Sequence, residues 1–205
     1  MSTWAHDKHP PPDYPYTRAF SAHSAAVQLY ARSGQLATAD LLFTRGKLPD
    51  QGCRLGCGED ESMRHIFVKC ACYQRWRDKV REQVVDKTTL KLETMMVEGP
   101  VKENLITAAK SLFIDNPAIW PLHLTMFYLG QIPDLNALIP PDHGLNNITL
   151  MRLRTHISSD WHTSSIRLAG RIFGDYQRRM ANINNIPLKT PLHHPLSTYI
   201  SNRRQ

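Results

Sequence analysis

The stretch that decides the fold is Cys53-Arg54-Leu55-Gly56-Cys57-Gly58-Glu59-Asp60-Glu61-Ser62-Met63-Arg64-His65-Ile66-Phe67-Val68-Lys69-Cys70. Together with Cys72 it holds all four cysteines of a 205-residue chain, which random placement would scatter. Three cysteines and one histidine follow the spacing Cys-x3-Cys-x7-His-x4-Cys. This spacing can supply the four sulfur or nitrogen ligands that zinc takes in a tetrahedron. We therefore predict that one structural zinc ion is bound by Cys53, Cys57, His65 and Cys70.

The residues between the ligands predict the local shape of the site. Gly56 and Gly58 flank Cys57, and glycine would let the backbone turn close to the metal without a Cβ clash. We expect a knuckle at this point. Residues 61–65 are then expected to begin a helix that presents His65, with the last ligand just over one turn later.

Other uses of the four cysteines remain open. The thiols could be free, buried or incidental, or they could form disulfide bonds, although the absence of a secretion signal disfavours disulfides. Cys72 could replace Cys70 as the last ligand. A catalytic zinc is disfavoured because three cysteines and one histidine fill the tetrahedral shell and leave no position for a reactive water.

Apolar residues recur at helical spacing on both sides of the cluster. The pattern over 17–43 predicts two short helices, and Tyr73, Trp76, Val80 and Val84 predict a third helix that leaves the site. We therefore expect a mainly α fold, with short helices around a small CCHC zinc knuckle.

The positions of prolines and the spacing of apolar residues also predict helices in the second half of the chain. Gly99-Pro100 marks a boundary, after which we expect one helix through 113 and another from Pro117, where proline fits a first turn. Residues 133–141 are expected to form a loop, and 147–180 one long amphipathic helix. The predicted organisation is a disordered Pro-rich N-terminus (1–16), a helical zinc-binding module (17–98), a helical region (99–182) and a flexible basic tail (183–205).

The charge balance points to a polyanionic partner. The chain carries 25 Lys and Arg against 18 Asp and Glu, a formal net charge of +7. This favours RNA or DNA, although acidic membrane surfaces or acidic proteins would satisfy the same charge. Residues near the cluster that could neutralise phosphates or stack on bases are Arg64, Lys69, Arg75, Trp76, Arg77 and Lys79. On the long helix, a face that could follow a phosphate backbone carries Arg167, Arg171 and Arg178. The ordinary alternatives are a solvated helix face for the arginines and core packing for Trp76.

Several functional classes are disfavoured. The N-terminal residues lack the basic start and apolar run of a secretory signal, and no apolar stretch approaches the 18 or so residues of a membrane span. No serine lies in a Gly-x-Ser-x-Gly turn. We therefore expect a soluble, nuclear or cytoplasmic protein that is not secreted, is not an enzyme and has no small-molecule substrate.

Three segments together resemble a known family. They are Ala39-Asp40-Leu41-Leu42-Phe43-Thr44-Arg45-Gly46-Lys47-Leu48, residues 53–62, and His65-Ile66-Phe67-Val68-Lys69-Cys70. The resemblance is to the zinc-binding module near the C-terminus of non-LTR (LINE-type) retrotransposon polyproteins, which follows the reverse transcriptase and is taken to contact nucleic acid. The four predicted ligands match the family's Cys, Cys, His and Cys, with a first gap of three residues where two are common. Residues 119–123 and 159–170 look like the tail of such elements in fungi.

The chain departs from the whole polyprotein in one respect. A polymerase of this kind holds magnesium with paired aspartates, and this chain has no Asp-Asp dipeptide and no room for a palm domain before Cys53. The resemblance therefore implies a nucleic-acid-binding remnant without polymerase activity. The alternative is a protein-interaction or inert relic module in which zinc is purely structural.

Overall fold

The structure is a computed structural model that describes residues 21–113, 125–142 and 144–183. These residues form helices and contain no strand, only an isolated antiparallel bridge between Gly52 and Asp60. The elements are α1 (Ala22–Arg32), α2 (Ala39–Thr44), the π-helical turn η3 (His65–Lys69), the 3-10 turn η4 (Ala71–Tyr73), α3 (Gln74–Thr94), α4 (Gly99–Ser111), α5 (Thr125–Tyr128), α6 (Leu135–Leu138) and α7 (Asn147–Ile183). The predicted mainly α fold is confirmed.

Most of the predicted helices are found close to their expected bounds. The two short helices, the helix after the cluster and the long helix correspond to α1, α2, α3 and α7. The predicted loop over 133–141 contains one turn of helix, α6, because the Asp134 side chain caps it by accepting a hydrogen bond from the Asn136 amide at 2.8 Å. The helix expected from Pro117, the N-terminus over 1–16 and the tail from 184 lie outside the described residues.

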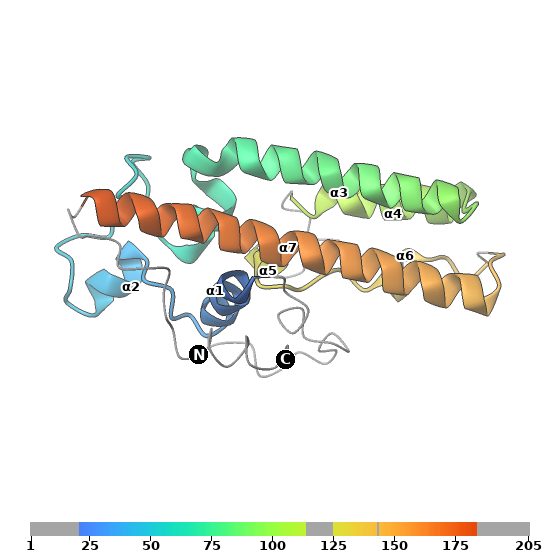
Figure 1. Cartoon of the computed structure of the whole chain (residues 1–205), viewed down its shortest axis with the longest axis horizontal. Helices are drawn as coiled ribbons and strands as arrows, with labels where there is room; N and C mark the ends of the chain where they lie inside the picture. Colours follow the sequence, from blue (N-terminus) through green and yellow to red (C-terminus); the bar gives the residue numbers. More distant parts are fainter. Residues whose placement is uncertain (1–20, 114–124, 143, 184–205) are drawn as a thin grey trace.

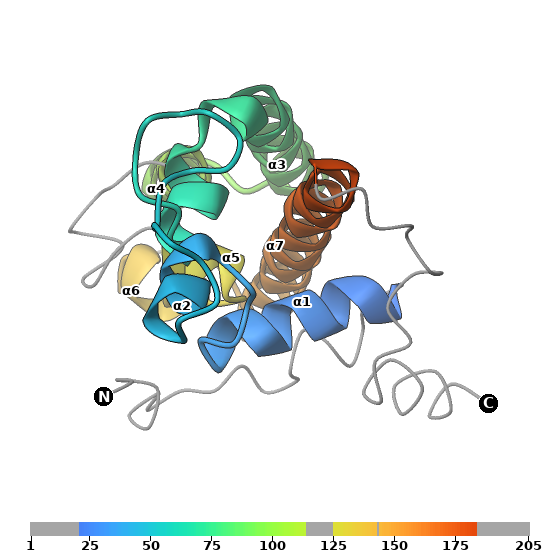
Figure 2. The same ribbon diagram turned by 90° about the vertical axis from the view of Figure 1, so that its left-hand side faces the viewer.

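The long helix α7 is the axis on which the other elements pack. In Figure 1, α3 runs alongside α7, and Figure 2 shows α1 crossing α7 on another side. The apolar stripe of α7 is buried along the helix, and its residues are Leu150, Leu153, Ile157, Trp161, Leu168, Ile172, Phe173, Tyr176 and Met180. The predicted amphipathic character of this helix is therefore confirmed.

One hydrophobic cluster joins the two predicted segments, 17–98 and 99–182. The indole Nε1 of Trp161 donates a hydrogen bond to Thr88 Oγ1 at 3.0 Å, which fixes α7 against α3. Phe67, in the turn that carries two of the predicted ligands, stacks on Tyr128 at 5.5 Å and meets Phe173 of α7 at 6.4 Å between ring centroids. The ligand-bearing turn is therefore part of the main core.

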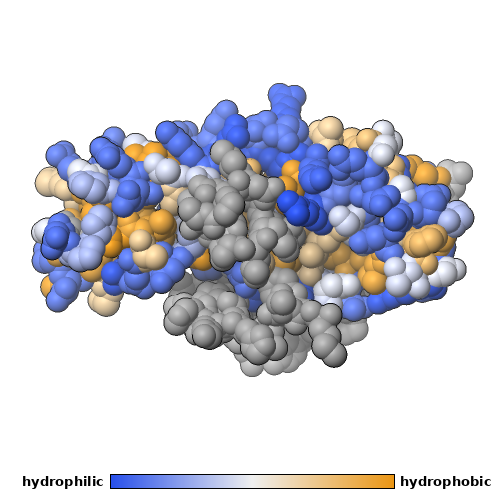
Figure 3. All heavy atoms as spheres, turned by 180° about the vertical axis from the view of Figure 1, so that it is seen from behind, coloured by the Kyte–Doolittle hydropathy of each residue, from blue (hydrophilic) through white to orange (hydrophobic). Residues whose placement is uncertain are grey.

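The surface of the described residues is largely hydrophilic with apolar areas near both ends. Figure 3 shows these areas from behind. The large apolar side chains that remain exposed are Phe43, Leu90, Met96, Ile148, Met151 and Ile183. Among the described helices, none combines the length and apolarity that crossing a membrane requires.

Candidate metal centre

The four predicted ligands converge in space. One donor atom from each of Cys53, Cys57, His65 and Cys70 lies within 4.8 Å of the other three, and the Sγ atoms of Cys57 and Cys70 are 3.3 Å apart. Tetrahedral ligands at zinc distances would be about 3.4–3.8 Å apart, so the cluster is compatible with a metal ion of that kind. The Cys72 thiol is exposed and lies outside this group, which leaves Cys70 as the fourth ligand.

The first two ligands are held by a closed loop. The Cys53 amide donates to Glu59 O at 2.8 Å, and the Gly56 amide donates to Cys53 O at 2.9 Å. Gly56 and Gly58 adopt positive φ angles of 82° and 76°. A Cβ atom at either position would meet no protein atom within 4 Å outside the neighbouring residues, so the left-handed backbone alone is enough to favour glycine here.

The last two ligands lie at the ends of a widened helical turn, where an ordinary helix beginning at 61–65 was expected. The Cys70 amide donates to His65 O at 2.6 Å, which is the five-residue spacing of a π turn. In an α-helix, residues five apart point about 140° away from each other. The wider turn therefore brings both side chains to the same site.

The His65 ring has the surroundings of a metal-binding imidazole. Its Nδ1 lies 3.2 Å from Glu59 Oε2, while its buried Nε2 has no hydrogen-bond partner. A ligand histidine commonly places one ring nitrogen on the metal and the other on a carboxylate. The orphaned Nε2 in a group of thiols therefore fits a metal ligand.

The charges around the thiols also fit a bound cation. Burial raises the pKa of the Cys53 and Cys70 thiols, and the neighbouring Cys57 thiol adds to both effects. A metal ion would offset this cost because thiolate is the form that binds metal. Three thiolates around a divalent ion leave one negative charge, which the buried Arg77 guanidinium beside Cys70 would balance.

Arg77 corrects one sequence prediction. Its side chain is buried, and Nη2 donates to Cys70 O at 2.8 Å and to Gln74 Oε1 at 2.7 Å. The Cys70 carbonyl thus accepts two hydrogen bonds, one from Arg77 and one from the Tyr73 amide at 3.1 Å. Arg77 therefore supports the site from inside and is not placed to contact nucleic acid.

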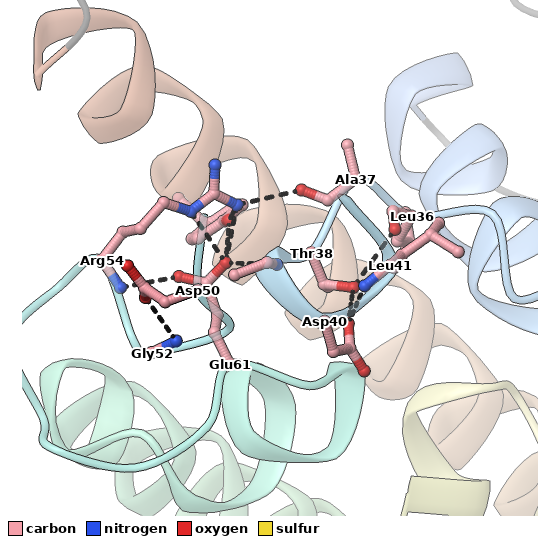
Figure 4. A network of polar contacts seen from close by, with 11 residues as sticks. Leu36, Ala37, Thr38, Asp40, Leu41, Asp50, Gly52, Arg54 and Glu61 are labelled. Carbon is pink, nitrogen blue, oxygen red and sulfur yellow. Dashed lines mark hydrogen bonds and ion pairs between the residues drawn. The ribbon is translucent and has the colours of Figure 1, made fainter. Parts of the chain in front are cut away.

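A buried carboxylate, Glu61, connects the metal loop to two helices, as Figure 4 shows. Its Oε1 accepts hydrogen bonds from the Ala39 amide at the start of α2 at 2.8 Å and from Arg54 Nη2 at 2.6 Å, and its Oε2 accepts one from the Arg54 amide at 3.0 Å. The Tyr176 hydroxyl of α7 also donates to Oε1. Burial and the bond to Glu61 raise the pKa of Tyr176, so its hydroxyl remains a donor.

The sequence reasoning missed Glu61. It is one of three acidic residues between Gly58 and Ser62, and nothing in this run marks which of them is buried. The one signal in the sequence is that Glu61 lies two residues before Met63, where the helical backbone that leads into η3 begins.

The structure brings two predicted groups of basic residues together. The Arg171 guanidinium of α7 lies 4.2 Å from the ring centroid of Trp76 at the start of α3, and Arg179 lies over Tyr73 at 6.0 Å. The exposed members of the predicted set are Arg64, Lys69, Arg75, Lys79, Arg167, Arg171 and Arg178. Trp76 is half-buried, with Arg171 on one face of its ring, so that face is not open to a base.

No protein-family model, curated protein or solved structure matches this chain.

Proposed function

We propose that this chain is a zinc-stabilised nucleic-acid-binding module of the kind found near the C-terminus of LINE-type retrotransposon polyproteins. Zinc is bound by Cys53, Cys57, His65 and Cys70, and shapes the fold. A basic surface made by the start of α3 and the second half of α7 binds the phosphate backbone of RNA or DNA. No polymerase chemistry is part of the proposal.

The choice of zinc is supported by the donor set. Three thiols and an imidazole within one tetrahedron-sized group are ligands that zinc prefers over magnesium or calcium. The identity of the ion is tested by elemental analysis of the purified protein. We expect one zinc per chain, lost in Cys53→Ser and Cys70→Ser and retained in Cys72→Ser, whose thiol lies outside the group. Zinc loss in Cys72→Ser together with retention in Cys70→Ser would show that the fourth ligand is wrong.

The observation that carries the nucleic-acid proposal is the contact between Arg171 and Trp76. It joins Arg75 and Lys79 of α3 to the exposed arginines of α7, two groups that are about 90 residues apart in the sequence. Arg178 is less available because it pairs with Asp175 at 3.3 Å. The cations proposed to meet phosphates beside this contact are Arg75, Lys79 and Arg171.

The nucleic-acid proposal is tested by titrating the zinc-loaded protein with fluorescent single-stranded RNA and duplex DNA at several salt concentrations. The affinity should fall as salt rises, because each phosphate contact releases condensed counterions. Lys79→Gln should weaken binding several-fold for all sequences and reduce the magnitude of the salt slope by about one. The matched control is Arg152→Gln, an exposed arginine about 28 Å from Arg171 along α7.

An affinity that does not change with salt would exclude phosphate neutralisation. Equal effects of Lys79→Gln and Arg152→Gln would place the contact elsewhere on the molecule. In either case the remaining function is the protein-interaction or relic module in which zinc only shapes the fold.

A further inference from the structure

The metal loop is connected to the end of the longest helix by a path of buried polar contacts. Arg54 lies between the ligands Cys53 and Cys57, and its amide and guanidinium both bind Glu61. Glu61 in turn accepts a hydrogen bond from Tyr176, which lies 115 residues further along the chain. The Arg54 guanidinium also donates directly to the Tyr176 hydroxyl.

Arg54 is partly exposed, but the inner end of this path is sealed from water. The side chain of Glu61 is fully buried, and Tyr176 is 1 % exposed. A buried carboxylate is tolerated only while its donors stay in place, because an unpaired buried charge is strongly unfavourable. Any displacement of Arg54 therefore destabilises the contact that fixes Tyr176.

The position of Arg54 depends in turn on the metal ligands. Cys53 and Cys57 flank it in a short loop whose closure involves only a few backbone hydrogen bonds, such as those of Cys53 with Glu59 and of Gly56 with Cys53. The thiols of Cys53 and Cys57 are half-buried and that of Cys70 is buried, and the three sulfur atoms lie in one group with a ring nitrogen of His65. A bound ion would fix the loop and with it the Arg54 backbone.

We propose that metal occupancy controls the order of the last turns of α7, residues 171–183, through Arg54, Glu61 and Tyr176. These turns carry Arg171, so loss of the ion also loosens the α7 side of the basic surface, while the first half of α7 stays packed. The inference rests on the metal-binding part of the proposed function and is independent of nucleic-acid binding.

The test is hydrogen exchange measured by mass spectrometry on the full chain, with zinc and after chelation. In the wild type, chelation should speed exchange over 171–183 by on the order of tenfold, because a hydrogen bond to an ionised carboxylate shifts a local opening equilibrium by about that factor. Exchange over 147–160 should change little, since that half of α7 packs on α3 through contacts such as that between Trp161 and Thr88.

Tyr176→Phe tests the path itself, because it removes the hydroxyl and keeps the packed ring. In this variant 171–183 should exchange faster even with zinc bound, and chelation should add much less than in the wild type. The matched control is Tyr128→Phe, since the buried Tyr128 hydroxyl has no hydrogen-bond partner among the described residues. This control should respond to chelation as the wild type does.

Three results would overturn the inference. They are unchanged exchange over 171–183 after chelation, a zinc response of Tyr176→Phe equal to that of the wild type, and equal loss of protection along the whole of α7. Zinc content is measured in every sample. If the wild type binds no zinc, the proposed function and this inference are both wrong. If it binds zinc but exchange over 171–183 does not change on chelation, this inference alone is wrong.

Discussion

At the scale of single residues, the buried carboxylate of Glu61 is stabilised by hydrogen bonds in place of water. Five donors converge on its two oxygens: the amides of Ala39 and Arg54, Nε and Nη2 of Arg54, and the hydroxyl of Tyr176. Such hydrogen bonds to an ionised group are among the stronger ones in proteins. Because they come from three separate segments, one side chain fixes the relative positions of α2, the metal loop and α7.

We predict that Glu61→Ala lowers the free energy of unfolding of the zinc-loaded protein by about 3–5 kcal/mol, because it leaves the Arg54 guanidinium half-buried without its partner. Urea denaturation with saturating zinc measures this change. Glu82→Ala on the exposed face of α3 is the control and should change stability by about 0.5 kcal/mol or less. A similar, small effect of both substitutions would show that the Glu61 contacts carry little energy.

The convergence of the three cysteines and the histidine could be predicted at this scale, and that of the residues around them could not. Cysteine and histidine spacing is visible in the sequence because the chemistry of the ligands is distinctive. Arg77 and Glu61 belong to types that are almost always on the surface. Their burial depends on carbonyls and amides that only the folded chain brings to them, which is why Arg77 was assigned to nucleic acid and Glu61 was overlooked.

At the scale of elements, the crossing of α1 and α7 depends on small residues. A Cβ atom on Gly170 would lie 2.6 Å from Ser24 Cβ and 2.7 Å from Ser24 Cα. Real Cβ atoms do not approach other atoms this closely, and the backbone of α1 would have to move. The absence of a side chain at Gly170 therefore sets how near the two helices lie.

We predict that Gly170→Ala destabilises the protein by about 1–3 kcal/mol through overpacking. In an unobstructed helix the same change would stabilise by up to about 1 kcal/mol, so the expected sign is the reverse of helix propensity. Thr155→Ala on the exposed face of α7 is the control and should be neutral or stabilising by about 0.5 kcal/mol. Urea denaturation measures both variants, and a stabilising Gly170→Ala would mean that α1 and α7 are further apart than described.

Most of the elements could be predicted from periodicity, because a stripe of apolar residues such as that of α7 requires little tertiary information. The widened turn η3 could not, because a π turn has no periodic signature of its own and exists here to bring His65 and Cys70 to one place. The close approach of α1 to α7 at Gly170 could not be predicted either, because a glycine within a helical pattern does not indicate which helix will pack against it.

At the scale of the whole molecule, the metal site and the helical region share one core. The buried residues Ile66, Phe67, Cys70 and Tyr73 of the ligand-bearing segment belong to the same cluster as the stripe of α7. An ion bound at the site would therefore stabilise more than the loop that binds it. Phe67 connects the site to Tyr128 and Phe173, and Glu61 connects it to Tyr176.

This shared core leads to a prediction for metal removal. An ion that binds only the native state stabilises it by about 2.7 kcal/mol when its free concentration is 100 times the dissociation constant. For a chain of this length that corresponds to a rise in Tm of about 5–10 °C. Thermal unfolding followed by far-ultraviolet circular dichroism should therefore show a lower Tm after chelation and its recovery when zinc is added back.

The variants serve as controls for this measurement. Cys53→Ser should have the Tm of the chelated protein, with or without added zinc, while Cys72→Ser should behave as the wild type does. Equal Tm values with and without zinc in the wild type would mean that the four converging ligands do not hold an ion that contributes to folding.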